Sequence, residues 1–284
     1  MNCEQSEADA LNSLDSALAV FADTDQYHTP KDARVSPVYR IPLLRSPWFH
    51  LRFCLGLLRR SRRLAIRGRF DDQALRDAGF HYLRMMEQAG AKFHVAGLSR
   101  LDQVAGPVVV VANHMSLCET FVLPAMINPR KHAVSFVVKQ SLVDYPIFGP
   151  VMRATRPVAV TRKNPREDFR RVMQQGSELL GQGRSVIIFP ETRRRLVFRA
   201  EHFNTLGERL AERAKVPVVP VALRTDFLAH GRLILDFGPL RQERAVHFEF
   251  GEPLLPGGGL REKHQAIVDF IGGRLRQWGV ACEE

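Results

Sequence analysis

The chain has 284 residues, of which 45% are hydrophobic, and this is enough for one large folded domain with an N-terminal extension. Its formal net charge of +11 favours an anionic partner, such as nucleic acid, an anionic membrane or a phosphorylated substrate. The four cysteines lie far apart and form no C-x-x-C pair, which argues against a zinc knuckle or a disulfide framework and favours a reducing compartment.

Residues 1–44 are predicted to be an acidic extension followed by a linker. The first 40 residues carry seven acids and three bases, so the rest of the chain carries a net charge of +15. Residues 6–22 have the pattern of one amphipathic helix, and residues 24–44 contain Pro30, Pro37 and Pro42. The acidic start does not resemble a secretory signal, and no apolar run approaches the ~18–20 residues that span a bilayer. We therefore do not expect an ordinary transmembrane protein.

Residues 45–69 contain eight arginines and no acid. At helical spacing Trp48, Leu51, Leu55 and Leu58 share one stripe. Large apolar side chains beside unopposed arginines favour a helix that lies in the lipid headgroup region. The alternative is a core helix with a solvated arginine-rich end. A solvent-exposed helix, however, usually carries acidic as well as basic residues. We predict that residues 45–91 are a basic, amphipathic, helical segment that associates with membranes.

From residue 92 onward, short β-rich runs alternate with helical stretches. The predicted strands are Pro107–Ala112, Val134–Val138, Val158–Val160, Ser185–Phe189, Val218–Leu223, Leu233–Phe237 and Val246–Phe250. The predicted helices are Arg166–Leu180, Phe203–Lys215 and Arg261–Trp278. This alternation predicts an α/β domain over residues 92–284, with a central, mostly parallel sheet flanked by helices. Near-continuous apolar strands indicate that the sheet is buried on both faces.

The first candidate site directly follows a predicted strand, where residues 113–119 read NHMSLCE. Ligands of open α/β sheets bind beyond the carboxyl ends of the strands, which is where His114 would stand. Ser116 and Glu119 also match a helix capping box, but a capping box does not explain the histidine. A carboxylate that fixes the imidazole would make His114 a general base for a hydroxyl.

Three further segments carry cations or prolines near strand ends. Residues 189–195 read FPETRRR, and a cation cluster at the carboxyl edge of a sheet suits a phosphate, although a solvated basic loop is the commoner outcome. Residues 139–162 begin with Lys139 and end with Arg162 after a short strand. Residues 216–221 read VPVVPV, and the prolines indicate an edge or irregular strand.

In this order and spacing, the four segments resemble those of the glycerolipid acyltransferase family typified by 1-acyl-glycerol-3-phosphate acyltransferase. The resemblance covers about residues 92–225. The family blocks are N-H-x-S-x-x-D, a lysine followed by P-x-x-G and an arginine, F-P-E-G-T-R, and V-P-[IV]-V-P-V. The matching positions are Asn113, His114, Ser116 and Glu119; Lys139, Pro146, Gly149 and Arg162; Phe189, Pro190, Glu191, Thr192 and Arg193; and Val216 to Val221. The chain departs from the family in having glutamate at 119 and no glycine between Glu191 and Thr192.

The resemblance implies a catalytic His114 and Glu119 and a phosphate-binding region. The residues assigned to that region are Arg193, Arg162, Lys139, Glu191 and Thr192. It implies acyl-CoA or acyl carrier protein as the co-substrate, and neither a metal nor a further cofactor is expected. Backbone amides near the helix start are expected to stabilise the oxyanion.

The predicted function is acyl transfer to the hydroxyl of a lysophospholipid, most favourably 1-acyl-glycerol-3-phosphate, at the cytoplasmic face of the cell membrane. The alternative is a weak or inactive family member that binds anionic lipid. A nucleic-acid partner is not expected, because the basic stretch is interleaved with Trp48, Phe49 and leucines instead of aromatic platforms on strands. A hydrolase is not expected either, because no G-x-S-x-G elbow occurs.

Overall fold

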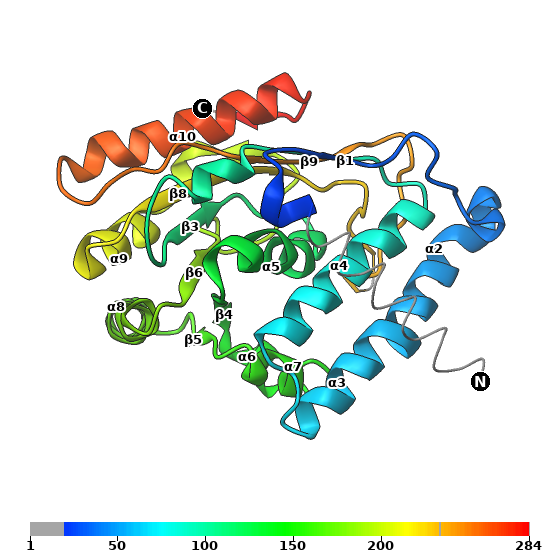
Figure 1. Ribbon diagram of the computed structural model, residues 1–284, viewed down its shortest axis with the longest axis horizontal. Helices are drawn as coiled ribbons and strands as arrows, with labels where there is room; N and C mark the ends of the chain where they lie inside the picture. The colour runs from blue at the N-terminus through cyan, green and yellow to red at the C-terminus, as the bar shows by residue number, and fades with distance from the viewer. Residues whose placement is uncertain (1–19, 233, 284) are drawn as a thin grey trace.

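The computed structural model describes residues 20–232 and 234–283, so most of the helix expected over residues 6–22 lies outside the described part. An eight-stranded sheet forms the centre of the protein (Figure 1). In spatial order its strands are β1 (Tyr27–His28), β2 (Phe93–Ala96), β9 (Val246–Phe250), β8 (Val218–Arg224), β3 (Val109–Ala112), β6 (Ser185–Ile188), β4 (Val134–Lys139) and β5 (Val158–Val160). The β1–β2 and β8–β9 pairs are antiparallel and the others are parallel, which confirms the predicted fold class.

Helices cover both faces of the sheet. Along β3, Val110 and Ala112 point into one hydrophobic cluster and Val109 and Val111 into the other, as the period of two along a strand requires. Helices α4 (Asp72–Gln88) and α5 (Cys118–Lys131) supply the first cluster. Helices α8 (Pro165–Gly181), α9 (Leu206–Ala214) and α10 (Leu260–Gln277) supply the second. Burial on both faces explains why these strands are almost continuously apolar.

Two predictions about strands were wrong. Residues 234–237 form turns instead of a strand, and Ile234, Leu235 and Phe237 are exposed; Leu233 lies outside the described residues. The proline-containing strand β8 lies in the middle of the sheet. It tolerates Pro220 because pairing with β9 begins only at Val221, and the Pro220 carbonyl accepts a hydrogen bond from the Gly251 amide (2.7 Å).

The described part of the N-terminal region is packed and does not behave as a linker. Pro37 begins the 3-10 helix η1 (Pro37–Arg40), and Pro42 begins α2 (Pro42–Arg52). Proline is favoured at this first helical position, where its missing N–H costs nothing. Tyr39 is fully buried, and residues of α2 and α4 share one core with β3 and α5. The prolines therefore start helices on the domain, and residues 45–91 pack against the rest of it.

Helix α2 continues through the π-helical turn η2 (Phe53–Leu58) into α3 (Arg59–Ile66). One face of this helix buries Phe49, Phe53 and Leu57. On the other face Trp48, Leu51 and Leu55 remain 45%, 48% and 60% exposed. Leu58, which was expected to share the exposed stripe, is buried, because the extra residue in the π turn rotates the residues that follow it. None of the described helices is both long and apolar enough to cross a bilayer.

Candidate active site

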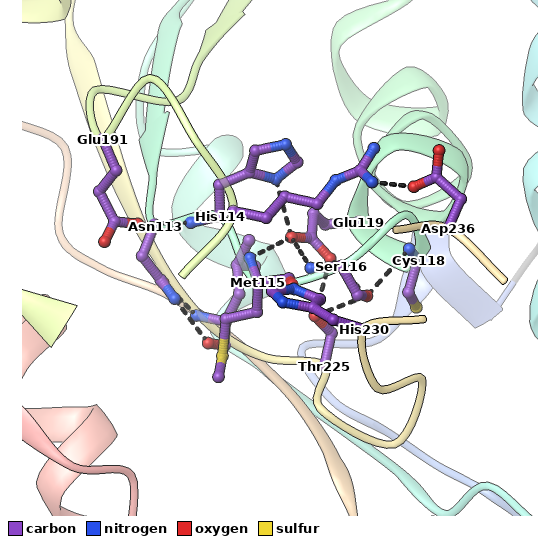
Figure 2. Close-up of polar contacts among 12 residues, drawn as sticks. Asn113, His114, Met115, Ser116, Cys118, Glu119, Glu191, Thr225, His230 and Asp236 are labelled. Carbon is purple, nitrogen blue, oxygen red and sulfur yellow. Dashed lines mark hydrogen bonds and ion pairs between the residues drawn. The ribbon is translucent and has the colours of Figure 1, made fainter. Parts of the chain in front are cut away.

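His114 stands just beyond the carboxyl end of β3, and its ring is held in one orientation (Figure 2). Its Nδ1 donates a hydrogen bond to Oε1 of Glu119 at 2.9 Å. The ring stacks on Phe189 with a centroid distance of 4.2 Å and an interplanar angle of 14°. Because Nδ1 carries the donated proton, the lone pair of the neutral ring is on Nε2. His114 also lines a cavity of about 110 Å³, where a substrate hydroxyl would meet it.

Glu119 is fully buried in the first turn of α5 and receives donors on both carboxylate oxygens. Oε1 accepts from the backbone N–H groups of Met115 (2.6 Å) and Ser116 (2.8 Å) as well as from His114. Oε2 accepts from the hydroxyl of Thr225 (2.7 Å). The extra methylene of glutamate is accommodated because the side chain bends back over the start of its own helix, where the helix dipole also favours a negative charge.

The surroundings favour a neutral imidazole beside an ionised carboxylate. Burial lowers the pKa of His114, and this outweighs the opposing effect of Glu119; Arg194 and Arg162 lower it further. Burial acts to raise the pKa of Glu119, but the hydrogen bonds and charge of His114 and the bonds from Thr225 and Ser116 bring it below its ordinary value. Near neutral pH, His114 is thus able to accept a proton and Glu119 to stabilise the resulting imidazolium.

The helix start also has the contacts of a capping box, and these coexist with the hydrogen bond between Glu119 and His114. The Ser116 amide donates to Glu119, and the Ser116 hydroxyl accepts from the Cys118 amide (3.1 Å). These contacts occupy the amides of Met115, Ser116 and Cys118 within the protein. The expectation that amides at the helix start stabilise an oxyanion is therefore not met by these three groups.

The backbone on either side of the His114 ring is fixed by segments distant in sequence. The amide of His114 donates to Oε2 of Glu191 (2.7 Å), and its carbonyl accepts from the amide of Arg195 (2.8 Å). The Asn113 side chain makes two hydrogen bonds, both of 2.8 Å, with the backbone of Leu223 in β8. Asn113 and Glu191 therefore position His114. Glu191, which was assigned to phosphate binding, points at the backbone of His114 (Figure 2).

Glu191 should give the protein a distinctive pH dependence of stability. Burial raises the pKa of this carboxyl to about 8. The unfolded chain loses the proton near the ordinary value of about 4.5 while the folded chain keeps it, so this group's contribution to stability falls as the pH rises from about 4.5 to about 8. Glutamine mimics the protonated acid. We expect Glu191→Gln to be more stable than the parent at pH 8, on the order of 4 kcal/mol, and to differ little at pH 4.5.

Urea unfolding of both proteins at the two pH values measures this difference. Taking the difference between variant and parent removes the contributions of the other titrating groups. If the difference does not change between pH 4.5 and pH 8, Glu191 is ionised in the folded protein.

The predicted phosphate-binding cations gather around a second cavity of about 820 Å³. Lys139 lies at the end of β4, Arg162 follows β5, and Arg193 follows β6; all three line this cavity. Lys139, Arg162 and Thr192 also line the smaller cavity with His114, so the two spaces adjoin. Burial and the nearby charge of Arg193 both lower the pKa of Arg162. Two guanidinium groups close enough to repel each other form a site that favours an anion.

The loop after β6 has the length of the family motif. Thr192 adopts a left-handed backbone with φ of 58°, the conformation that glycine favours at such a position. Thr192 therefore replaces the glycine of F-P-E-G-T-R, no residue is deleted, and Arg194 occupies the position of the family arginine. Arg194 lines the cavity with His114, whereas Arg193 lines only the neighbouring one.

Three residues that were given no role from the sequence contribute to this site. Thr225 donates to Glu119, Phe189 stacks on His114, and Asp236 pairs with Arg194. Thr225 lies just past the carboxyl end of a predicted strand, and the rule that located His114 would have located it as well. Asp236 lies inside the predicted strand Leu233–Phe237 and not at its end, so the same rule does not locate it.

The domain resembles proteins of known activity. A family model described as acyltransferase matches residues 92–224. The chain is 34% identical over 134 residues to the 1-acyl-sn-glycerol-3-phosphate acyltransferase of Pseudomonas aeruginosa, a match that covers 47% of this chain and 50% of that protein. It is 33% identical over 132 residues to a 1-acyl-sn-glycerol-3-phosphate acyltransferase of Chlamydomonas reinhardtii, covering 46% of this chain and 38% of that protein. The chain thus matches half or less of the length of these relatives.

The fold is also similar to a solved structure. The crystal structure of the 1-acyl-sn-glycerophosphate (LPA) acyltransferase, PlsC, from Thermotoga maritima matches with a TM-score of 0.66, covering 86% of this chain and 98% of that one. At 15% identity this likeness concerns the fold. It includes the helices before residue 92, since the match extends well beyond the family model.

Proposed function

We propose, from the match of residues 92–224 to the acyltransferase family model, that the protein transfers a fatty acyl chain from a thioester to the hydroxyl of a lysophospholipid. The donor is acyl-CoA or acyl carrier protein, and the favoured acceptor is 1-acyl-glycerol-3-phosphate, which would become phosphatidic acid. The observation that carries this proposal is the His114–Glu119 pair, which opens onto one cavity together with cationic side chains.

In this mechanism His114 acts first as a base and then as an acid. Its Nε2 removes the proton of the acceptor hydroxyl while the oxygen attacks the thioester carbonyl. The tetrahedral intermediate collapses, the C–S bond breaks, and the imidazolium returns the proton to the leaving thiolate. Glu119 stabilises the imidazolium between the two steps. The buried Cys118 thiol is unsuited to act as a nucleophile, because burial raises its pKa well above the ordinary range.

The cations divide between the two cavities, and this suggests how the acceptor lies. Arg194 shares the small cavity with His114, and its charge lowers the pKa of His114 more than the charge of Arg162 does. Lys139 and Arg162 stand where the two cavities adjoin, and Arg193 lies in the larger one. The rest of the small cavity is mostly apolar and suits the start of an acyl chain. We propose that Arg194, with Arg162 and Lys139, holds the acceptor phosphate and that Arg193 contributes from the adjoining cavity.

We expect Arg194→Ala to raise the KM for 1-acyl-glycerol-3-phosphate about ten- to a hundred-fold, because a hydrogen bond between charged groups contributes ~1.5–3 kcal/mol. Arg193→Ala should have a smaller effect, and neither change should alter the KM of the acyl donor by as much. Initial rates with each substrate varied in turn measure these effects. Monoacylglycerol, which lacks the phosphate, serves as a control acceptor. If Arg193→Ala has the larger effect, the phosphate lies in the larger cavity.

The protein is proposed to act as a peripheral protein at the cytoplasmic face of the membrane. The exposed stripe on α2 and η2, defined here as Leu43, Leu44, Trp48, Leu51 and Leu55, is apolar. Arginines follow it in α3, among them the exposed Arg59, Arg60 and Arg63. Apolar side chains that enter the headgroup region beside cations that attract an anionic leaflet are the features of an interfacial helix.

We expect Trp48→Ser, Leu51→Ser and Leu55→Ser together to weaken binding to anionic vesicles by at least about tenfold, because burying each side chain in lipid would contribute on the order of 1–2 kcal/mol. Deleting residues 1–69 would be a poor test, because it also removes Phe49, Phe53 and Leu57 from the core. Vesicle sedimentation measures the binding. Leu255→Ser is the matched control, since Leu255 is exposed near the start of β8, at the opposite edge of the sheet from His114. Equal binding by the triple variant and the control would place the membrane contact elsewhere.

The proposed activity is tested by incubating purified protein with acyl-CoA and with acyl carrier protein thioesters against a panel of lysolipids, with products identified by mass spectrometry. Acylation of 1-acyl-glycerol-3-phosphate is the expected result. Acylation of a different lysolipid would keep the reaction and change the acceptor. A folded protein that binds anionic vesicles but transfers no acyl chain would be a lipid-binding member of the family.

A further inference from the structure

An acid occupies the place where an acceptor anion is expected to bind. Asp236 forms an ion pair with Arg194, and Figure 2 marks this contact of Asp236 with a dashed line. The two side chains are only 28% and 14% exposed. Both line the small cavity with His114, and Asp236 is the one acid among the described residues that line it. Asp236 therefore satisfies an arginine that shares the cavity with the proposed catalytic histidine.

This pairing has a direct consequence for binding. A phosphate oxygen and the Asp236 carboxylate seek the same guanidinium donors, and a buried anion beside the site also repels a second anion. A phosphorylated acceptor can engage Arg194 fully only when Asp236 moves away. The free energy required to break the Arg194–Asp236 ion pair therefore weakens the binding of every anionic ligand that uses Arg194.

The segment that carries Asp236 runs from the cavity to α2, where it contacts half-buried side chains. The Nε2 of His50 in α2 donates to the Gly238 carbonyl (2.7 Å), and the Ser46 hydroxyl accepts from the Leu240 amide (3.0 Å). The rings of His50 and Phe237 lie 5.1 Å apart. Beside Asp236, the side chains of Ile234 and Leu235 are about half exposed, at 55% and 47%. The segment thus presents apolar side chains beside the helix that carries the exposed stripe.

We propose that Asp236 is an internal competitor for the acceptor's anionic headgroup on Arg194, and that contact of Ile234 and Leu235 with a lipid surface favours the arrangement in which this ion pair is open. The inference rests on the proposed function for the identity of the acceptor, but the competition itself concerns any phosphate monoester. A lipid surface is able to shift this equilibrium only if it binds the open arrangement better, and insertion of the two apolar side chains supplies that difference. Catalytic power is then greatest at the bilayer, where the acceptor is found.

The competition is tested without turnover. Calorimetric titration of the full chain with glycerol 3-phosphate compares the parent, Asp236→Asn and Glu243→Gln. Glu243 is exposed, and its replacement makes the same change in net charge outside the cavity. We expect Asp236→Asn to bind about tenfold more tightly than the parent, and Glu243→Gln to bind as the parent does. Equal affinities of the two variants, or no binding by either, would overturn the competition.

The membrane contribution is tested by activity. The readout is the ratio of kcat/KM for 1-acyl-glycerol-3-phosphate in vesicles of phosphatidylcholine and phosphatidylglycerol to kcat/KM for a soluble short-chain analogue. Asp236→Asn should reduce this ratio severalfold by raising activity on the soluble acceptor. Ile234→Ser with Leu235→Ser should reduce it by lowering activity on vesicles alone. An unchanged ratio in both variants would overturn the membrane contribution. If the parent acylates neither acceptor, the proposed function fails, while the titration still decides the competition.

Discussion

His114→Ala should lower the rate of acyl transfer by ~10²–10⁴-fold, the usual contribution of a general base. The structure supports a large effect, because a single imidazole would serve both proton transfers and its orientation is fixed by Glu119 on one nitrogen and by Phe189 on one face. The fold should survive, since Glu119 keeps its donors from Met115, Ser116 and Thr225.

The measurement is the initial rate at saturating donor and acceptor, with thermal melting of the same samples. His28→Ala, a change of an exposed histidine on β1, is the matched control and should keep the parental rate. Added imidazole should restore part of the activity of His114→Ala. Unchanged turnover in a folded variant would mean that another group removes the proton.

Glu119→Gln should lower kcat by about 10²-fold, whereas Glu119→Asp should retain more activity. Glutamine has nearly the same shape, but it is neutral. Its carbonyl oxygen can still accept from the N–H groups around Oε1 while its NH2 group donates to the Thr225 hydroxyl, so the main loss is the negative charge beside His114. Aspartate keeps the charge that stabilises the imidazolium but reaches less far.

The pH profile separates this role from a merely structural one. The Glu119 carboxylate raises the pKa of His114 against the effect of burial. Its loss should therefore move the acidic limb of kcat/KM to lower pH, by roughly one pKa unit or more. If Glu119→Gln loses stability but keeps the parental rate and pH profile, Glu119 serves only to cap the helix.

The buried parts of the molecule were predictable from sequence, because burial leaves a pattern. Strands β3, β4, β5, β6, β8 and β9 all appeared as apolar runs within one or two residues of their observed bounds. The helices on the second face were predicted with similar accuracy. The strand predicted over residues 233–237 was wrong for a related reason: Ile234, Leu235 and Phe237 are apolar but exposed, and an apolar run alone does not show whether a segment is buried.

The site was predictable where it depends on strand ends and not where it depends on tertiary contacts. His114 and Glu119 were located from a strand, a turn and a helix start. Arg194 was passed over in favour of Arg193, because the backbone angle that lets Thr192 replace a glycine is visible only in the structure. The position of Glu191 was likewise hidden, since its partner is a backbone amide 77 residues away.

The long-range contacts around His114 have a consequence for the protein during its synthesis. The Asn113 side chain is hydrogen-bonded to the backbone of Leu223, 110 residues later, and Glu119 accepts a hydrogen bond from Thr225, 106 residues later. Until β8 has left the ribosome and joined β3, Glu119 lacks the donor from Thr225 and the turn that carries His114 lacks its hydrogen bonds to Leu223. A growing chain can form much of the core and still have no ordered imidazole. The proposed acyl transfer would therefore begin only when β8 has joined the central sheet.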